Sequence, residues 1–269
     1  MLKYFNIASV KIACLISEGD SGAQKQSLVF IAGSGGDHTA WLNQYAQLKK
    51  KYNIVAVDLP GHGRSEGTGE RHVKDYCVWI KNLLDALGLN EPILVGHSLG
   101  AAIALQFAVS HPKKIAGIVC LGGGMKMPVN PFMLEFLKTN PAQMPAEITE
   151  LICKFSLAKE NRPQFSAVLQ KNISGSKVDI LYGDLSACDE MDLTGEAEKI
   201  KVPALIICGA EDKMTPPDLS RALAANITGS SLEIIAGAGH MVMLEQPVEF
   251  CKALEKFTAS ISASTAASG

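Results

Sequence analysis

A serine between two glycines follows a short apolar run in ILVGHSLGAAIAL, residues 93–105. A serine hydroxyl there could attack a carbonyl carbon, provided that a base takes its proton and donors stabilise the developing oxyanion. The run before Ser98 has the length of a strand, and the run after it has the length of a helix. Gly96 and Gly100 permit a tight turn between the two, which would expose the hydroxyl. The pattern favours a nucleophile, although a plain turn serine has the same motif.

His240 is the best candidate for the base among six histidines. It follows the last strand-like run, in GAGHMV, where Gly237 and Gly239 let the backbone bring the ring over the sheet edge. We interpret the other five as loop, rim, packing or capping residues: His38, His62, His72, His97 and His111.

Asp212 is the predicted acid that fixes the tautomer of His240, because it directly follows a strand-like run in CGAEDKMTPP. Glu211 is the runner-up for this role. Asp184 and Asp189 lie in a region without strands and are weaker candidates.

Two backbone amides are predicted to bind the oxyanion. The amide of Leu99 begins the helix after the nucleophile, and the amide of Ser34 lies in the glycine-rich loop IAGSGGDH. Loss of one such donor typically lowers the rate by about 10²–10³. A plain flexible turn is the alternative interpretation of this loop.

Six short apolar runs recur along the chain and are continuous rather than alternating, which is typical of parallel strands covered by helices on both faces. Helix-length segments such as 73–89 and 99–111 separate them. The alternation predicts an α/β protein with a doubly wound, mostly parallel sheet, and ligands bind such sheets at the carboxyl edge. The runs are 27–33, 52–59, 92–97, 115–123, 204–210 and 231–239.

This rhythm stops between residues 124 and 199, where apolar residues recur at helical spacing and prolines are frequent. We expect a helical cap there, inserted into a core of residues 1–123 and 200–260, with 261–269 as a flexible tail. Five apolar side chains are candidates for the substrate pocket, with ordinary packing as the alternative for each: Met125, Met127, Phe132, Met133 and Met241.

The composition excludes several classes of protein. The 269 residues carry a net charge of −2, with 47% hydrophobic and 19% charged residues, as in a globular protein without a nucleic-acid-binding face. No apolar run reaches transmembrane length, and the start of the chain favours two paired strands over a signal peptide. The seven cysteines form no C-x-x-C pair, which favours reduced, buried thiols in a cytoplasmic protein.

Five blocks resemble the α/β-hydrolase superfamily in order and spacing, between about residues 25 and 257: AGSGG, DLPGHGRS, VGHSLG, CGAEDKMTP and GAGHMVMLEQP. The likeness is strongest to bacterial esterases and C–C hydrolases with a helical cap. Many members have His-Gly at the start of the oxyanion loop, where this chain has Ala32-Gly33. The resemblance implies the same roles by position: nucleophile Ser98, acid Asp212, base His240, and oxyanion amides of Ser34 and Leu99.

These features predict a serine hydrolase that cleaves a small to medium, fairly apolar carboxylic ester without a metal or organic cofactor. The expected partner is a small-molecule ester or acyl substrate rather than nucleic acid or a membrane, and a homodimer stays open. The absence of basic clusters argues mildly against a strongly anionic substrate. Three alternatives remain: a C–C bond hydrolase of a diketone-type ring-cleavage product, an acyltransferase or thioesterase, and a slow-turnover ligand-binding receptor.

Overall fold

Eight strands form one mixed sheet in the computed structural model, which describes residues 1–17, 25–140 and 144–268. Their order across the sheet is β1-β2-β4-β3-β5-β6-β7-β8, and neighbours from β4 to β8 in that order are parallel. β1 and β2 pair antiparallel, as expected for the start of the chain, and β2 continues antiparallel onto β4. The bounds are β1 Leu2–Ile7, β2 Val10–Ile16, β3 Ser27–Ile31, β4 Asn53–Val57, β5 Ile93–His97, β6 Gly117–Leu121, β7 Ala204–Gly209 and β8 Ser231–Ile235.

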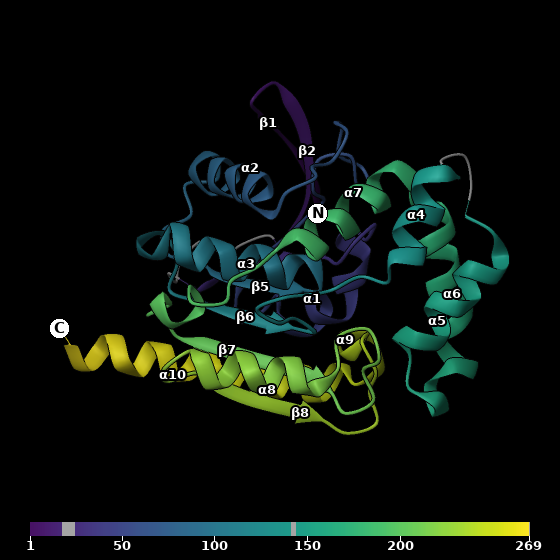
Figure 1. Cartoon of the computed structure of the whole chain (residues 1–269). Helices are drawn as coiled ribbons and strands as arrows, with labels where there is room; N and C mark the ends of the chain where they lie inside the picture. Colours follow the sequence, from purple (N-terminus) through teal and green to yellow (C-terminus); the bar gives the residue numbers. More distant parts are fainter. Residues whose placement is uncertain (18–24, 141–143, 269) are drawn as a thin grey trace.

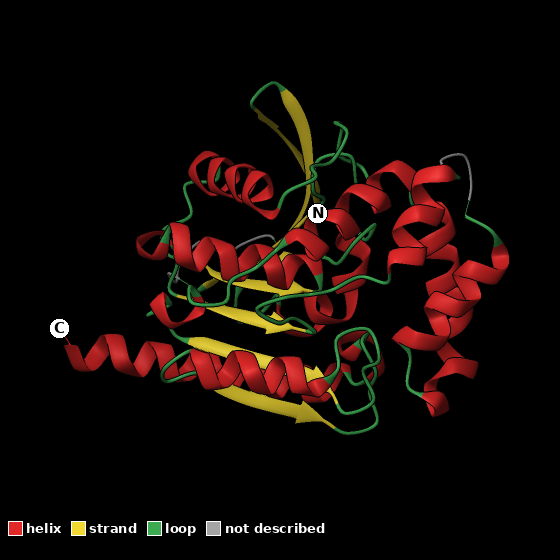
Figure 2. Cartoon of the chain, in the orientation of Figure 1, coloured by secondary structure: helices red, strands yellow, loops and turns green. Residues whose placement is uncertain are grey.

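Helices cover the sheet on both faces, so the predicted α/β class is confirmed (Figures 1 and 2). Every residue of β5, β6 and β7 is buried, which explains why their runs are apolar without alternation. The prediction of burial on both faces is wrong for β8, whose residues are only partly buried or exposed. β8 is the edge strand, so it has a neighbouring strand on one side only.

Neighbouring residues of one strand contribute to different cores, because successive side chains point to opposite faces of a sheet. Val29 and Ile31 of β3 join the core under α2 and α3, whereas Phe30 joins the core with Trp41 and Phe250 on the other face. The ring of Trp41 lies 5.0 Å from that of Phe30. The first face carries α2 Val73–Ala86, α3 Leu99–Ser110 and α8 Pro217–Asn226, and the second carries α1 Leu42–Leu48, α9 Val242–Glu245 and α10 Pro247–Ser268.

Four helices stand between β6 and β7 and lie beyond the carboxyl ends of the central strands, on the right of Figure 1. Within the described part of 124–199 there is no strand, and one isolated bridge pairs Lys126 with Asp192. We refer to this region as the cap. Its helices are α4 Pro131–Thr139, α5 Ala146–Ser156, α6 Arg162–Gly175 and α7 Val178–Glu190.

The carboxyl-terminal segment differs from the expected tail. α10 runs from Pro247 to Ser268, so residues 261–268 are helical rather than irregular. The alanines of this segment favour a helix once the preceding turns have supplied the costly nucleus. Residue 269 lies outside the described residues. No helix of the described chain is long and apolar enough to span a bilayer.

The seven cysteines are free and buried in the structure, which confirms that they are thiols rather than disulfides. Burial raises the pKa of Cys14 and of Cys77 to about 12. A buried thiol with a raised pKa is a poor nucleophile, so these residues fill the core.

Candidate active site

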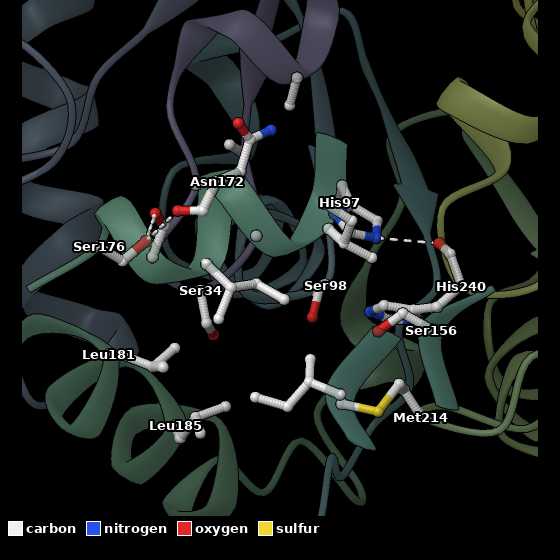
Figure 3. Close-up of a pocket in the computed structure, with 18 of the residues that line it drawn as sticks. Ser34, His97, Ser98, Ser156, Asn172, Ser176, Leu181, Leu185, Met214 and His240 are labelled. Atoms are coloured by element: carbon white, nitrogen blue, oxygen red, sulfur yellow. Dashed lines mark hydrogen bonds between the residues drawn. The ribbon is translucent and has the colours of Figure 1, made fainter. Parts of the chain in front are cut away.

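Ser98 occupies the sharp turn between β5 and α3. Its backbone angles, φ 53° and ψ −114°, are rare for any residue but glycine and typically cost about 1–3 kcal/mol. The surrounding backbone holds it there: its N–H donates to the carbonyl of Leu121 at 2.9 Å, and its own carbonyl accepts from Ala101 and Ala102. The hydroxyl faces a cavity under the cap, as Figure 3 shows.

The glycines on either side of Ser98 are required by close packing of the backbone. A Cβ on Gly96 would lie 1.9 Å from the carbonyl oxygen of Gly100, and a Cβ on Gly100 would lie 2.2 Å from the carbonyl oxygen of Ile31. Both distances are far below any van der Waals contact. Only glycine at these positions lets β5, α3 and β3 come together around Ser98.

The structure brings His240 and Asp212 together although 28 positions separate them. Nδ1 of His240 lies 2.8 Å from Oδ2 of Asp212, and both side chains are buried. Thr215 adds a second donor, because its hydroxyl lies 2.9 Å from the same carboxylate oxygen. The other oxygen, Oδ1, accepts the N–H groups of Met214 and Thr215 at 2.9 Å each.

These contacts set the protonation states at the site. Burial alone would raise the pKa of Asp212, but the charge and hydrogen bond of His240, with the donors of Thr215, outweigh it and keep that pKa below its usual value. An ionised Asp212 can accept a hydrogen bond from Nδ1–H of His240, and in that tautomer of the neutral ring Nε2 carries the free lone pair. Ser98 and His240 line the same cavity, without a hydrogen bond between their side chains in the structure as described. Such contacts often tighten only when substrate is bound.

His97 supports His240 from behind the nucleophile. Its Nε2 donates to the backbone carbonyl of His240 at 3.0 Å, and the two rings lie 4.6 Å apart between centroids. Burial, together with the charge of His240, lowers the pKa of His97 to about 3, so this ring stays neutral. The predicted packing role of His97 thus includes a specific hydrogen bond to the candidate base.

The two amides predicted for the oxyanion lie beside Ser98. Leu99 is the first residue of α3, and no described group accepts a hydrogen bond from its N–H or from that of Ser34. A Cβ built on Gly33 would lie 3.1 Å from Cβ of Ser98 and 2.9 Å from Nδ1 of His97, so the glycine-rich loop lies directly over the nucleophile. Ala32, which stands where many members of the family have a histidine, is buried at the base of this loop.

A cavity of about 680 Å³ joins these groups to the cap. Its floor includes Ser98, His240 and Ser34, and its roof comes mainly from apolar side chains of the cap helices. The helical spacing of apolar residues predicts these helices without identifying which of their faces point inward. The apolar residues that it missed include Leu151, Ile152, Phe155, Leu169, Leu181 and Leu185.

The predicted pocket residues divide into two groups. Met127, Met133 and Met241 line the cavity, whereas Met125 and Phe132 do not. Met125 packs against the core beneath α2 and α3, and Phe132 is 63% exposed. Phe132 and Met133 are neighbours on one helix and point about 100° apart. A periodic pattern therefore identifies the helix more readily than the residue that faces the ligand.

The remaining histidines make local contacts instead of reaching Ser98. The group Asp37, His38 and Asp58 has the residue types of a metal site, but its atoms bond to one another and to neighbouring backbone. The hydrogen bond between His38 and Asp58 raises the pKa of His38. The four contacts are His38 with Asp58, His62 with Asp184, His72 with Glu190, and His111 with the ring of Phe107.

Comparison with known proteins gives this geometry its family. The sequence model of the alpha/beta hydrolase family matches residues 28–253, which contain the serine turn, the Asp212 loop and the His240 loop. This chain belongs to the alpha/beta hydrolase family. It is therefore an enzyme of the hydrolase class, as the sequence blocks predicted.

Relatives of this alpha/beta hydrolase are named for different hydrolytic activities. A Burkholderia vietnamiensis protein named 2-hydroxy-6-oxononadienedioate/2-hydroxy-6-oxononatrienedioate hydrolase is 27% identical, over 95% of this chain and 94% of its own. A thermophilic esterase of known structure is 32% identical, with a TM-score of 0.81 over 97% of this chain and 99% of its own. The enol-lactonase of Burkholderia xenovorans LB400 shares the fold, with a TM-score of 0.87, 22% identity and coverage of 96% and 100%.

Proposed function

We propose that this alpha/beta hydrolase cleaves small to medium, fairly apolar carboxylic esters through an acyl-enzyme on Ser98. The observation that carries the proposal is the shared cavity, in which the hydroxyl of Ser98, the ring of His240 and the loop of Ser34 meet. A volume of about 680 Å³ lies within the range of small-molecule sites. The apolar roof favours an acyl or alcohol group without charge.

In the first half-reaction, Oγ of Ser98 attacks the ester carbonyl carbon while Nε2 of His240 takes the hydroxyl proton. The carbonyl oxygen becomes an oxyanion, which the N–H groups of Ser34 and Leu99 stabilise. When the intermediate collapses, the bond to the alkoxy oxygen breaks and His240 gives its proton to the leaving alcohol. Asp212 stabilises the transient imidazolium through its hydrogen bond to Nδ1.

In the second half-reaction, water attacks the acyl carbon and His240 takes a proton from that water. The oxyanion forms again at the same two amides. Collapse then breaks the bond to Oγ, which recovers the proton from His240, and the carboxylic acid is released. The buried, neutral His97 takes no part in proton transfer and keeps the His240 loop in place.

A series of p-nitrophenyl esters of increasing chain length, with wild type and Ser98→Ala, tests the proposal. We expect hydrolysis by wild type with a chain-length optimum, and no turnover by Ser98→Ala at unchanged thermal stability. Intact-mass analysis after rapid quenching would show an acyl adduct on the wild type only. Near wild-type activity in the variant would refute Ser98 as the nucleophile.

A C–C bond hydrolase is the second candidate, and one observation favours it. Arg64, Lys171, Lys177 and Lys213 line the cavity, and within the described chain none of them forms an ion pair. These residues are scattered in the sequence. The absence of basic clusters, which argues against a strongly anionic substrate, therefore does not reveal that four cations meet at the cavity. Cations around the cavity suit a substrate with carboxylates, and the Burkholderia vietnamiensis relative is named for two dioates, which are dicarboxylates.

A comparison of kcat/KM for two substrates separates the two candidate functions. We would compare kcat/KM for a diketone-type dicarboxylate with that for a neutral butyrate ester, in wild type and in the double variant Arg64→Gln and Lys177→Gln. The second candidate predicts a preference for the dicarboxylate that the double variant loses through a higher KM. A preference for the neutral ester in both proteins would favour the esterase.

A further inference from the structure

The glycine-rich loop over Ser98 is a tight turn with a defined orientation of its central peptide. The N–H of Gly36 donates to the carbonyl of Gly33 at 2.9 Å and closes the turn. Gly35 stands at its third position with φ +66°, as a type II turn requires. The central peptide carries the N–H of Gly35, and its rotation is the main difference between type II and type I turns. Whatever binds this N–H therefore selects the shape of the loop.

Both backbone polar groups of Gly35 are bound by residues of the cap. Oδ2 of Asp184, on α7, accepts the Gly35 N–H at 2.8 Å. The hydroxyl of Ser176, between α6 and α7, donates to the Gly35 carbonyl at 2.7 Å. A Cβ on Gly35 would lie 2.9 Å from Oγ of Ser176. The cap therefore binds the loop through two hydrogen bonds to Gly35, the residue after Ser34, whose amide is the candidate oxyanion donor.

The carboxylate of Asp184 is itself fixed by two donors from the core. Nε2 of His62 lies 2.8 Å from Oδ2, and the hydroxyl of Tyr76 donates to Oδ1. Asp184 is completely buried. A carboxylate with three donors in a dry environment has little freedom to rotate, which suits it to hold a neighbouring peptide in one orientation.

We propose that Asp184 is a positioning residue of the oxyanion hole: by accepting the Gly35 N–H, it holds in one shape the turn that carries the Ser34 amide. The proposal rests on the proposed function, since it takes Ser98 as the nucleophile and the Ser34 amide as a donor. Because Asp184 and Ser176 belong to the cap, the oxyanion hole is complete only while α7 is docked on the core. The cap is thus part of the catalytic machinery as well as the roof of the cavity.

Steady-state kinetics of Asp184→Ala tests this role. We expect kcat to fall about 10- to 100-fold with KM changed less than about 3-fold, since a misdirected donor costs less than the ~10²–10³ of a lost one. Asp184→Asn retains an oxygen that can accept the Gly35 N–H, so it should recover most of the lost kcat. The matched control is Asp179→Asn, an exposed site on the same helix, which should keep wild-type kinetics.

Three results would overturn the proposal. One is wild-type kcat in a folded Asp184→Ala protein, with folding checked by thermal denaturation. Another is a rise in KM alone, which would indicate substrate binding. If Asp184→Ala does not fold, Ser176→Ala replaces it in the test, and we expect its kcat to be about 3- to 10-fold below that of wild type. The third overturning result belongs to that variant. Unchanged kcat in that variant would overturn the proposal.

Labelling with a fluorophosphonate distinguishes failure of this inference from failure of the proposed function. The probe reacts with an activated serine and develops negative charge on a phosphoryl oxygen in the same hole, whatever the natural substrate. Slower labelling of Asp184→Ala than of wild type would support positioning. Equal rates would overturn it and leave Ser98 as the nucleophile. A wild type that neither reacts with the probe nor hydrolyses esters would overturn both.

Discussion

The backbone N–H of His240 donates to the carbonyl oxygen of Ser156 across 2.7 Å, although Ser156 ends a cap helix and His240 belongs to the core. Glu245 extends this link. Its Oε1 accepts the Gly239 N–H at 2.9 Å, and its Oε2 accepts the Ala158 N–H at 2.8 Å. The cap therefore holds the candidate base on one side of the cavity, while Asp212 holds its ring. Opening of the cap at this edge would break the hydrogen bond that positions His240.

Glu245→Gln should weaken both stability and turnover. An amide in place of the buried carboxylate sets an NH₂ group against a backbone N–H, either of Gly239 or of Ala158. One unsatisfied donor of this kind costs about 1–3 kcal/mol, so we expect the free energy of unfolding to fall by that amount in urea titrations. We expect kcat to decrease as the His240 loop loosens. The exposed Glu249→Gln serves as the control, and equal behaviour of the two variants would contradict the link.

Asp212→Asn should abolish most turnover without unfolding the protein. An amide that donates toward Nδ1 favours the wrong tautomer of His240, in which Nε2 carries the proton and has no lone pair to accept the hydroxyl proton of Ser98. Loss of kcat on the order of 10⁴ is expected for such a change. The assay is steady-state ester hydrolysis, with circular dichroism to confirm the fold. A loss below about tenfold would indicate that another acid, such as the adjacent Glu211, serves His240.

The buried pair of His62 and Asp184 should make stability depend on pH. Both ring nitrogens of His62 face acceptors, since Nδ1 lies 3.0 Å from the carbonyl of Pro60 and Nε2 lies 2.8 Å from Asp184. Burial opposes the charged ring, but the hydrogen bond and charge of Asp184, with the Pro60 carbonyl, outweigh it and raise the pKa of His62 above 6.5. The other ionisable groups that face this ring are Tyr76, whose pKa is also raised, and Asp58.

A raised folded-state pKa fixes the sign of this effect. The stabilisation is complete below the unfolded-state pKa of about 6.5 and is lost as the pH rises through the folded-state pKa. His62→Gln should therefore lower the free energy of unfolding most at pH 5.5, by on the order of 3 kcal/mol, and by less at alkaline pH. Urea titrations at the two pH values measure this difference. His72→Gln removes an exposed pair with Glu190 and should cost little at any pH. A cost for His62→Gln that is independent of pH would contradict this, because it would show that folding does not shift the pKa of His62.

Leu185→Trp should shorten the cavity and shift the preference toward short acyl chains. Leu185 lines the cavity from α7, beside Leu181 in Figure 3. Each excluded methylene forfeits about 0.8 kcal/mol, so kcat/KM for octanoate should fall at least tenfold more than that for acetate. Phe132→Trp, on the exposed side of the cap, is the matched control. A parallel loss for both esters would show that Leu185 does not contact the acyl chain.

The sequence alone determined the class of the fold and the candidate groups around Ser98. A strand that helices cover on both faces is apolar at every position, as β5 and β6 are, so its sequence is a continuous apolar run. Motifs within a few residues of a strand end also fix their own local geometry, as the positive φ of Ser98 illustrates. The order of strands then placed Asp212 and His240 at the same sheet edge, because parallel strands share their carboxyl ends.

Only the tertiary structure decided which side chains of the cap face the cavity and which contacts join the cap to the core. Met133 lines the cavity and Phe132 does not, since one helical step turns a side chain by about 100° and periodicity tolerates either choice. By its place in the sequence Asp184 is only a weak candidate for the acid, yet it binds Gly35, which lies 149 positions away. Contacts over such separations depend on how helices dock, and docking is a property of packing rather than of any local pattern.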